Sequence, residues 1–205
     1  MNARARRSSL AAGTARWQWL ALAVIAFAAP ESALAFDAAE LMSMMAKIER
    51  SSVAFEETKH IAALAAPLMR KGTLSYIRPD QLEMQVAEPY FERLEIAGER
   101  LTIETRKGKR QIDLAAQPLA AAWIESLRAT LSGNLAGLGR YYSFQLVGQR
   151  ERWKLALRPL DRSLAGIVDR IEISGGEAQI ERIAIEETQG DRTMLVLSPH
   201  APAKP

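Results

Sequence analysis

Residues 72–86 read GTLSYIRPDQLEMQV, and their apolar side chains alternate with polar ones in two runs that Arg78-Pro79 separates. An alternation with a period of two is typical of β-strands that bury one face. In the first run Leu74 and Tyr76 share a face, and Arg78 falls on the same face. The second run begins its own apolar face at Leu82. The stretch therefore predicts two strands and aims an arginine at the apolar side of a sheet.

The position of Arg78 requires an explanation, because a guanidinium group cannot lose its charge in a protein. Burying it without hydrogen-bond acceptors would cost several kcal/mol. One interpretation is that the strand ends there and the aliphatic stem carries the charge to water. The rest of the chain has to show whether that interpretation holds.

The first 35 residues have the pattern of a cleaved secretory signal peptide. Four arginines come first or flank an apolar run of 13 residues from Trp17 to Ala29, and the small-residue pattern Ala33-Leu34-Ala35 follows. A helix needs about 20 apolar residues to span a bilayer, and no other stretch is continuously apolar enough. We therefore expect cleavage before Phe36 and a product exported to the periplasm.

Charge and cysteine content exclude several classes of protein. The expected leader holds four of the 27 basic residues and one of the 24 acidic residues, so the remainder carries 23 of each and is formally neutral. The calculated pI of 9.3 is thus poor evidence for a nucleic-acid partner, and none is predicted. The absence of cysteine excludes disulfides, thiolate metal sites and a lipid-modified cysteine.

The remaining 170 residues have the size of one domain, which we place at 36–198, followed by a disordered tail at 199–205. Asp37 and Glu40 predict the start of a first helix, and Pro118 the start of a second. The other segments alternate as strands: 53–64, 68–78, 81–86, 91–96, 101–105, 111–114, 142–147, 153–157, 167–173, 180–187 and 193–197. Ten or eleven antiparallel strands and two helices predict an α+β fold, an incomplete and strongly curved β-barrel with helices over its concave face.

Residues able to carry out catalysis are sparse. Beyond the leader the histidines are His60, in a strand, and His200, in the tail, and the chain has no G-x-S-x-G motif. Two distant histidines and scattered carboxylates give no metal-ligand spacing. We therefore predict a protein that is not an enzyme and that uses no metal or cofactor, and a hydrolase is the weakest of the functions considered.

Several elements together resemble the LolA family of periplasmic outer-membrane lipoprotein carriers. They are an opening helix, Phe55-Glu56-Glu57, the segment Gly72-x-Leu74-x-x-x-Arg78-Pro79 with its alternating strand, Pro89 and a glycine hairpin at Gly98. Glu57 replaces the usual glutamine, and Leu82 and Met84 replace the usual aromatics. These departures are closer to LolA-related proteins encoded with lipid or aryl-polyene synthesis and export genes.

The resemblance implies a fold and a mechanism. The family fold is an incomplete antiparallel barrel in which helices cover an apolar cavity for acyl chains. The family's strand arginine, matched by Arg78, bonds to the backbone of the covering helices and helps to keep the empty carrier closed. Here the acceptors would be carbonyls in the segment 118–139. The expected cavity wall comprises Leu74, Tyr76, Leu82, Met84, Leu94, Ile96, Leu101, Ile103, Trp123, Ile124, Leu127, Trp153, Leu155 and Leu157.

The function implied is a monomeric periplasmic carrier or chaperone. It would receive acylated cargo, a lipoprotein or a glycolipid or polyene lipid, from an inner-membrane donor complex and deliver it to an outer-membrane acceptor. An acyl chain needs roughly 10 kcal/mol of shelter from water, at about 0.8 kcal/mol per methylene. If helices fill the concave face completely, a non-catalytic binding or scaffold protein of an envelope lipid-export system becomes the better interpretation.

Overall fold

The computed structural model describes residues 36–199, except the side chains of 118–120 and 122–123. The expected signal peptide and residues 200–205 of the expected tail lie outside the described residues. Pro199, which the prediction assigned to the tail, pairs with Val53 in β11.

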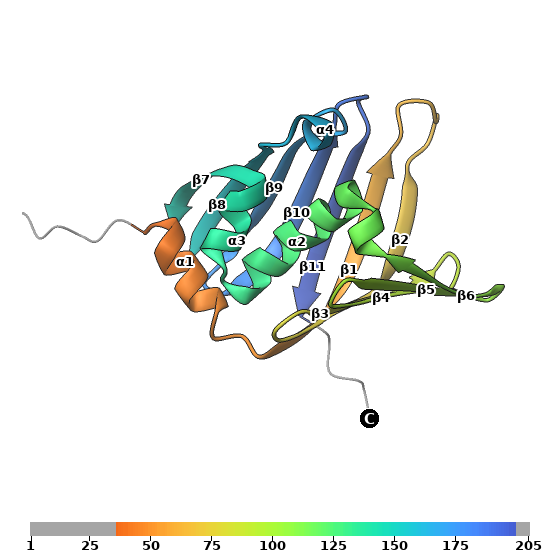
Figure 1. Ribbon diagram of the computed structural model, residues 1–205, viewed down its shortest axis with the longest axis horizontal. Helices are drawn as coiled ribbons and strands as arrows, with labels where there is room; N and C mark the ends of the chain where they lie inside the picture. Colours follow the sequence, from red (N-terminus) through yellow and green to blue (C-terminus); the bar gives the residue numbers. More distant parts are fainter. Residues whose placement is uncertain (1–35, 200–205) are drawn as a thin grey trace, which may run out of the picture. The chain divides into compact units, whose positions relative to one another are not determined.

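The described residues form one antiparallel sheet of eleven strands with helices on one face, which confirms the α+β class (Figure 1). The strand order is β6-β5-β4-β3-β2-β1-β11-β10-β9-β8-β7. The bounds are α1 Ala38–Met45, β1 Arg50–His60, β2 Leu68–Ile77, β3 Gln81–Glu88, β4 Glu92–Ala97, β5 Arg100–Thr105, β6 Gly108–Asp113, η1 Leu114–Ala116, α2 Pro118–Ser132, α3 Leu135–Tyr141, β7 Tyr142–Gln149, β8 Arg152–Pro159, α4 Arg162–Ala165, β9 Val168–Gly176, β10 Gln179–Glu187 and β11 Arg192–Pro199.

The register confirms the faces that alternation predicted for the opening stretch. Residues directly opposite one another on neighbouring strands share a face, and two such rows cross β2, β3, β4 and β5. The first row is Leu74, Met84, Leu94 and Ile103, and the second is Tyr76, Leu82, Ile96 and Leu101. The interruption at Arg78-Pro79 lies in the turn between β2 and β3.

Several element boundaries differ from the prediction. β1 ends at His60 rather than residue 64, because the apolar residues 61–67 form the turn of the β1–β2 hairpin. The structure also has α3 and the short helices η1 and α4, in addition to the two helices that the sequence predicted. Asn134 begins α3 by accepting a hydrogen bond from the Gly137 amide at 2.9 Å.

The sheet bends enough for its two halves to face one another across α2. Leu74 of β2 and Leu94 of β4 line the same cavity as Ile173 of β9 and Leu195 of β11. The edge strands β6 and β7 do not pair with each other within residues 36–199. The sheet is therefore curved and open, and closure into a barrel is not seen.

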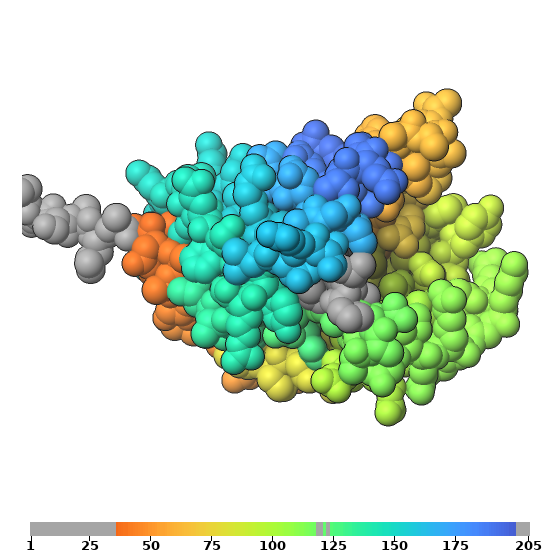
Figure 2. Space-filling model, turned by 45° about the horizontal axis from the view of Figure 1, so that its top comes forward, coloured from red at the N-terminus to blue at the C-terminus, as the bar shows by residue number. Residues whose placement is uncertain are grey.

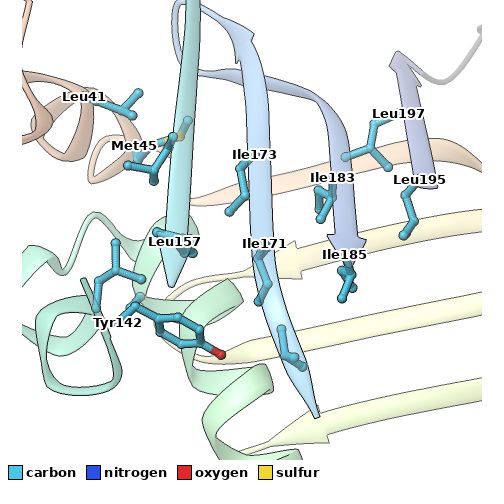
Figure 3. Packing of buried hydrophobic residues seen from close by; sticks show 14 of the residues in the cluster. Leu41, Met45, Tyr142, Leu157, Ile171, Ile173, Ile183, Ile185, Leu195 and Leu197 are labelled. Carbon is cyan, nitrogen blue, oxygen red and sulfur yellow. The ribbon is translucent and has the colours of Figure 1, made fainter. Parts of the chain in front are cut away.

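The largest cluster of buried side chains packs α1 and α3 against strands β7 to β11 and extends to Phe55 of β1 and Val86 of β3 (Figure 3). Leu41 and Met45 of α1 and Leu138 of α3 are completely buried against these strands. A smaller cluster around Tyr76, Leu82 and Ile124 joins α2 to β2–β4. The concave face is thus covered by two sets of helices.

Candidate functional site

An apolar cavity of about 80 Å³ lies beneath α2. Its wall comes from both halves of the sheet and from the helix, and one polar side chain, Ser126, takes part in it. The lining residues are Leu74, Leu82, Met84, Leu94, Ile96, Ser126, Leu127, Ile171, Ile173, Ile183 and Leu195. This lining suits a hydrocarbon and offers almost no group that could orient a polar ligand.

The predicted wall residues fall into three groups in the structure. Those that line the cavity are Leu74, Leu82, Met84, Leu94, Ile96 and Leu127. Four predicted residues lie beside the cavity. Tyr76 lines an adjacent groove, Ile103 and Ile124 are buried, and Leu101 is partly buried. The side chain of Trp123 lies outside the described residues.

The third group, Trp153, Leu155 and Leu157, is placed in the packed core and not around the cavity. Each is at most 1 % exposed, and all three belong to the cluster that Leu41 and Leu138 fill from the helices. The Trp153 indole also donates a hydrogen bond to the Glu177 carbonyl at 2.9 Å. Alternation identified the inward face of β8 correctly, but it could not show which helix covers that face.

Sequence reasoning missed the lining residues of the C-terminal strands. Ile171 and Ile173 in β9 alternate clearly, as do Ile183 and Ile185 in β10, and Ile183 lies opposite both Ile173 and Leu195. The signal was present in the sequence. Only the bending of the sheet brings these strands over β2–β4.

An open groove of about 610 Å³ adjoins the cavity. Leu74, Leu127 and Ile183 line both spaces, so the groove leads to the interior past these three side chains. Its outer part includes Ser52 and Gln179, and is therefore more polar than the cavity. The gradient from polar rim to apolar interior is the arrangement that an amphiphile requires.

Arg78 donates two hydrogen bonds to the backbone carbonyl of Ser132, the last residue of α2, at 3.2 Å from Nη1 and 3.3 Å from Nη2. The last carbonyls of a helix have no partner within the helix, and a cation there also interacts favourably with the helix dipole. The last turn of α2 has no basic residue of its own. Arg78 supplies that charge from the sheet, through one carbonyl rather than two.

Tyr76 lies beside Arg78 at the same end of α2. Its hydroxyl donates a hydrogen bond to the Pro79 carbonyl at 3.2 Å, and its ring is 2 % exposed. Burial raises the pKa of Tyr76 above its ordinary value, and the neighbouring Arg78 guanidinium partly opposes that rise. The end of β2 and the turn after it therefore place an aromatic ring and a cation together under the helix.

Arg128, which sequence reasoning did not single out, also fastens α2 to the sheet. Here the arginine belongs to the helix and the acceptors belong to the sheet turns. Its guanidinium donates to the Gly98 carbonyl at 2.7 Å, to the Asp80 carbonyl at 3.1 Å and to the Asp80 carboxylate at 3.4 Å. That carboxylate also accepts the Gly98 amide at 3.2 Å. The Arg128 side chain is 14 % exposed. Together Arg78 and Arg128 form a polar clamp between α2 and two sheet turns.

The end of α2 also rests on α1. Gly133 has φ of 71°, the left-handed conformation that favours glycine at a helix end. A Cβ there would come within 2.2 Å of the Met42 carbonyl oxygen, so only glycine allows this close approach. The contact positions the Ser132 carbonyl in front of Arg78.

A second ionic group lies on the concave face at the other end of β1 and β2. Glu57, 5 % exposed, accepts from Arg70 at 2.7 and 2.8 Å, and Arg70 also reaches Glu92 at 3.2 Å. The carboxylate at position 57 is therefore held by a bidentate ion pair.

The described side chains include no group of three or more His, Asp or Glu residues that could hold a metal ion. His60 is exposed at the end of β1, away from the cavity. His200 lies outside the described residues. No helix among residues 36–199 is long and apolar enough to cross a membrane.

One family is matched in the comparisons with known proteins. A family model described as "Outer membrane lipoprotein carrier protein LolA-like" matches residues 28–204. No curated protein sequence matches the chain.

Three solved structures are similar to the chain. A LolA superfamily protein from Nitrosomonas europaea is 13 % identical, covers 80 % of this chain and 92 % of its own, and has a TM-score of 0.45. An outer membrane lipoprotein-sorting protein domain from Vibrio parahaemolyticus is 11 % identical, with coverage of 82 % and 92 % and a TM-score of 0.41. The MucA/MucB complex from Pseudomonas aeruginosa is 13 % identical, covers 82 % of this chain and 59 % of its own, and has a TM-score of 0.43.

Proposed function

Because the chain belongs to the LolA-like outer membrane lipoprotein carrier family, we propose that it is a periplasmic carrier that shelters acyl chains beneath α2. The observation that carries this proposal is the apolar cavity between α2 and both halves of the sheet. The work of such a protein is binding and release, so it requires no catalytic group.

The cavity alone is too small for a long acyl chain, so in this proposal α2 moves when cargo binds. Pockets for drug-sized ligands hold about 300–1,000 Å³, whereas this cavity holds about 80 Å³. In this proposal, the closed form of the carrier is the one in which α2 covers the cavity. In the open carrier, α2 lifts from β2–β4, and the passage past Leu74 and Leu127 from the groove to the interior widens.

Approximate free energies indicate how cargo binding and the closing of α2 compete. Removing one of these arginines should cost about 1–2 kcal/mol, so Arg78 and Arg128 together hold α2 by roughly 2–4 kcal/mol. Burying one acyl chain contributes roughly 10 kcal/mol, at about 0.8 kcal/mol per methylene. Cargo can therefore open the clamp, and re-formation of the clamp offsets part of the cost of release.

In this scheme Arg78 is a gating residue and Arg128 a second one. Cargo from an inner-membrane donor displaces α2, and the Ser132 carbonyl leaves the Arg78 guanidinium. At an outer-membrane acceptor the acyl chain leaves and the clamp closes again. The candidate cargoes are a lipoprotein, a glycolipid or a polyene lipid of an export system.

One observation favours a second candidate function. Because the cavity is small, the helices nearly fill the concave face, as expected for a binding or scaffold component of an envelope lipid-export system. The two functions differ in whether long-chain amphiphiles enter the protein.

A pair of neighbouring substitutions tests entry. Met84 faces the cavity, and the next residue, Gln85, is exposed on the opposite face of β3. Met84→Glu should abolish binding of a fluorescent fatty acid, and Gln85→Glu should leave it unchanged, both variants being checked by circular dichroism. No binding by the natural protein would favour the scaffold. Mass spectrometry of lipids extracted with the periplasmic protein from its host would identify the cargo.

A further inference from the structure

We propose that the tip of the β1–β2 hairpin, residues 61–69, is a membrane-contacting element that inserts apolar side chains into a lipid surface. This inference goes beyond the proposed carrier function and does not depend on the cavity. It concerns the side chains at the far end of the hairpin from the Arg78 clamp.

The tip exposes large apolar side chains to water. Leu64, Leu68 and Met69 are 49 %, 48 % and 56 % exposed. Leu68 pairs with Lys59, and Met69 pairs with Thr58, so the two neighbouring side chains point to opposite faces of the hairpin. The tip is thus apolar on both sides, whereas a strand that merely covers a core is apolar on one.

The sequence of the tip is IAALAAPLM, nine residues without a charged or hydrogen-bonding side chain. Hairpin turns in water usually contain Gly, Asn, Asp or Ser, which satisfy the local backbone. When such an uncharged turn enters the interface between headgroups and acyl chains, its side chains lose no hydrogen bonds to water. The free-energy cost comes from the dehydration of its backbone.

The cations that flank the tip already have partners. Lys59 pairs with Glu187 at 3.0 Å, Lys71 with Glu56 at 2.8 Å, and Arg70 with the carboxylate of Glu57. The flanks are therefore close to neutral, and the attraction to a membrane should be hydrophobic and not electrostatic.

The base of the tip is fixed to the neighbouring turn. The Ala62 amide donates to the Asp191 carboxylate at 2.9 Å, and the Leu64 amide donates to the Ile61 carbonyl at 2.9 Å. The hairpin projects from the surface at the upper right of Figure 2. In Figure 2 the surface is hollowed between this hairpin, drawn in gold, and the green segments near β5 and β6. The tip is therefore a braced projection beside that hollow.

A lipid surface suits this projection better than a protein partner. Protein interfaces combine shape complementarity with about one hydrogen bond per 100–200 Å², and the tip side chains offer no hydrogen bond at all. A fluid interface accommodates a narrow convex tip without a matching pocket. Three half-exposed side chains give weak and reversible binding, unlike a transmembrane helix.

Vesicle flotation with the full exported protein tests the proposal. The natural protein should associate with phosphatidylcholine vesicles, and equally with vesicles containing phosphatidylglycerol, at low and at high salt. The double variant Leu64→Asn/Leu68→Asn should lower the partition coefficient about tenfold or more, since each half-exposed leucine contributes about 1 kcal/mol. Leu160→Asn, at a leucine 56 % exposed elsewhere, is the control and should change nothing.

A fluorescent reporter separates insertion from mere proximity. Leu64→Trp should show a blue shift with vesicles and quenching by lipids brominated near the headgroup. Absence of vesicle binding, equal binding by the double variant, or binding that salt abolishes would each overturn the proposal. Loss of cargo transfer by the double variant without any vesicle binding would assign the tip to a protein partner instead. Fatty-acid binding in the cavity should be unchanged throughout.

Discussion

The two halves of the concave face are packed in different ways. Under α1 and α3, apolar side chains such as Leu155 and Leu138 are fully buried in one packed cluster. Under α2, apolar side chains border a cavity, and Arg78 and Arg128 hold the helix through polar contacts at the rim. A dry core resists opening over its whole area. A helix fastened at a few polar points can be released when those points are broken.

The largest difference between the halves should appear in stability. Leu155→Ala leaves a cavity in a packed core and should lower the free energy of unfolding by about 2–5 kcal/mol. Leu94→Ala enlarges a space that already exists at a partly buried site, and should cost less than about 2 kcal/mol. Chemical denaturation with unchanged m-values checks both. Equal losses would mean that the two halves are packed alike.

The next effect concerns the clamp. Arg128→Gln removes bonds to Gly98 and Asp80, so the closed state should weaken and affinity for a fluorescent fatty acid should rise about 5- to 30-fold, as expected for 1–2 kcal/mol. Arg78→Leu should raise affinity less, because its donors share one carbonyl, and should slow release to acceptor membranes.

Arg78→Lys should fall between Arg78→Leu and the natural protein, because lysine keeps the charge and loses the planar fork. The matched control is Arg158→Gln, at an arginine 61 % exposed and distant from α2. Affinities that are equal in all variants would show that Arg78 and Arg128 do not restrain the helix.

The smallest predicted effect is a titration. Arg78 opposes the rise that burial causes in the pKa of Tyr76, so Arg78→Leu should raise that pKa further, as followed by tyrosinate absorbance. A folded-state pKa above 10.0 favours the neutral phenol. The stability that it contributes is therefore full below pH 10 and falls as the pH rises through the folded-state pKa. A lower pKa in the variant would contradict the placement of these groups.

Local alternation was enough to predict most strands and the inward faces of β2, β3, β4 and β8. The residues Leu74, Met84 and Leu94 lie where the period of two places them. Alternation cannot show which distant strands of the sheet come close to one another in space. The contribution of Ile173 to the cavity, and the burial of Leu155 under other helices, follow from curvature and from the docking of α1 and α3.

Of the two arginines that hold α2, only Arg78 could be singled out from the sequence. An arginine on an apolar face requires an acceptor, which drew attention to Arg78 before any contact was known. Arg128 gave no such signal, since an arginine on an amphipathic helix is ordinary. Its role follows from the turns at Asp80 and Gly98, which the register brings beneath α2.

The central claim is that α2 moves when an acyl chain binds, whereas α1 stays in place. The sequence has no cysteine, so spin labels can be introduced in pairs without background. Pulsed electron resonance should measure one pair, Glu125→Cys in α2 with Glu95→Cys in β4, and a reference pair, Ser43→Cys in α1 with Gln145→Cys in β7. On adding a long-chain fatty acid, the α2 distance should lengthen and the α1 distance should not. An unchanged α2 distance with the fatty acid bound would contradict the account.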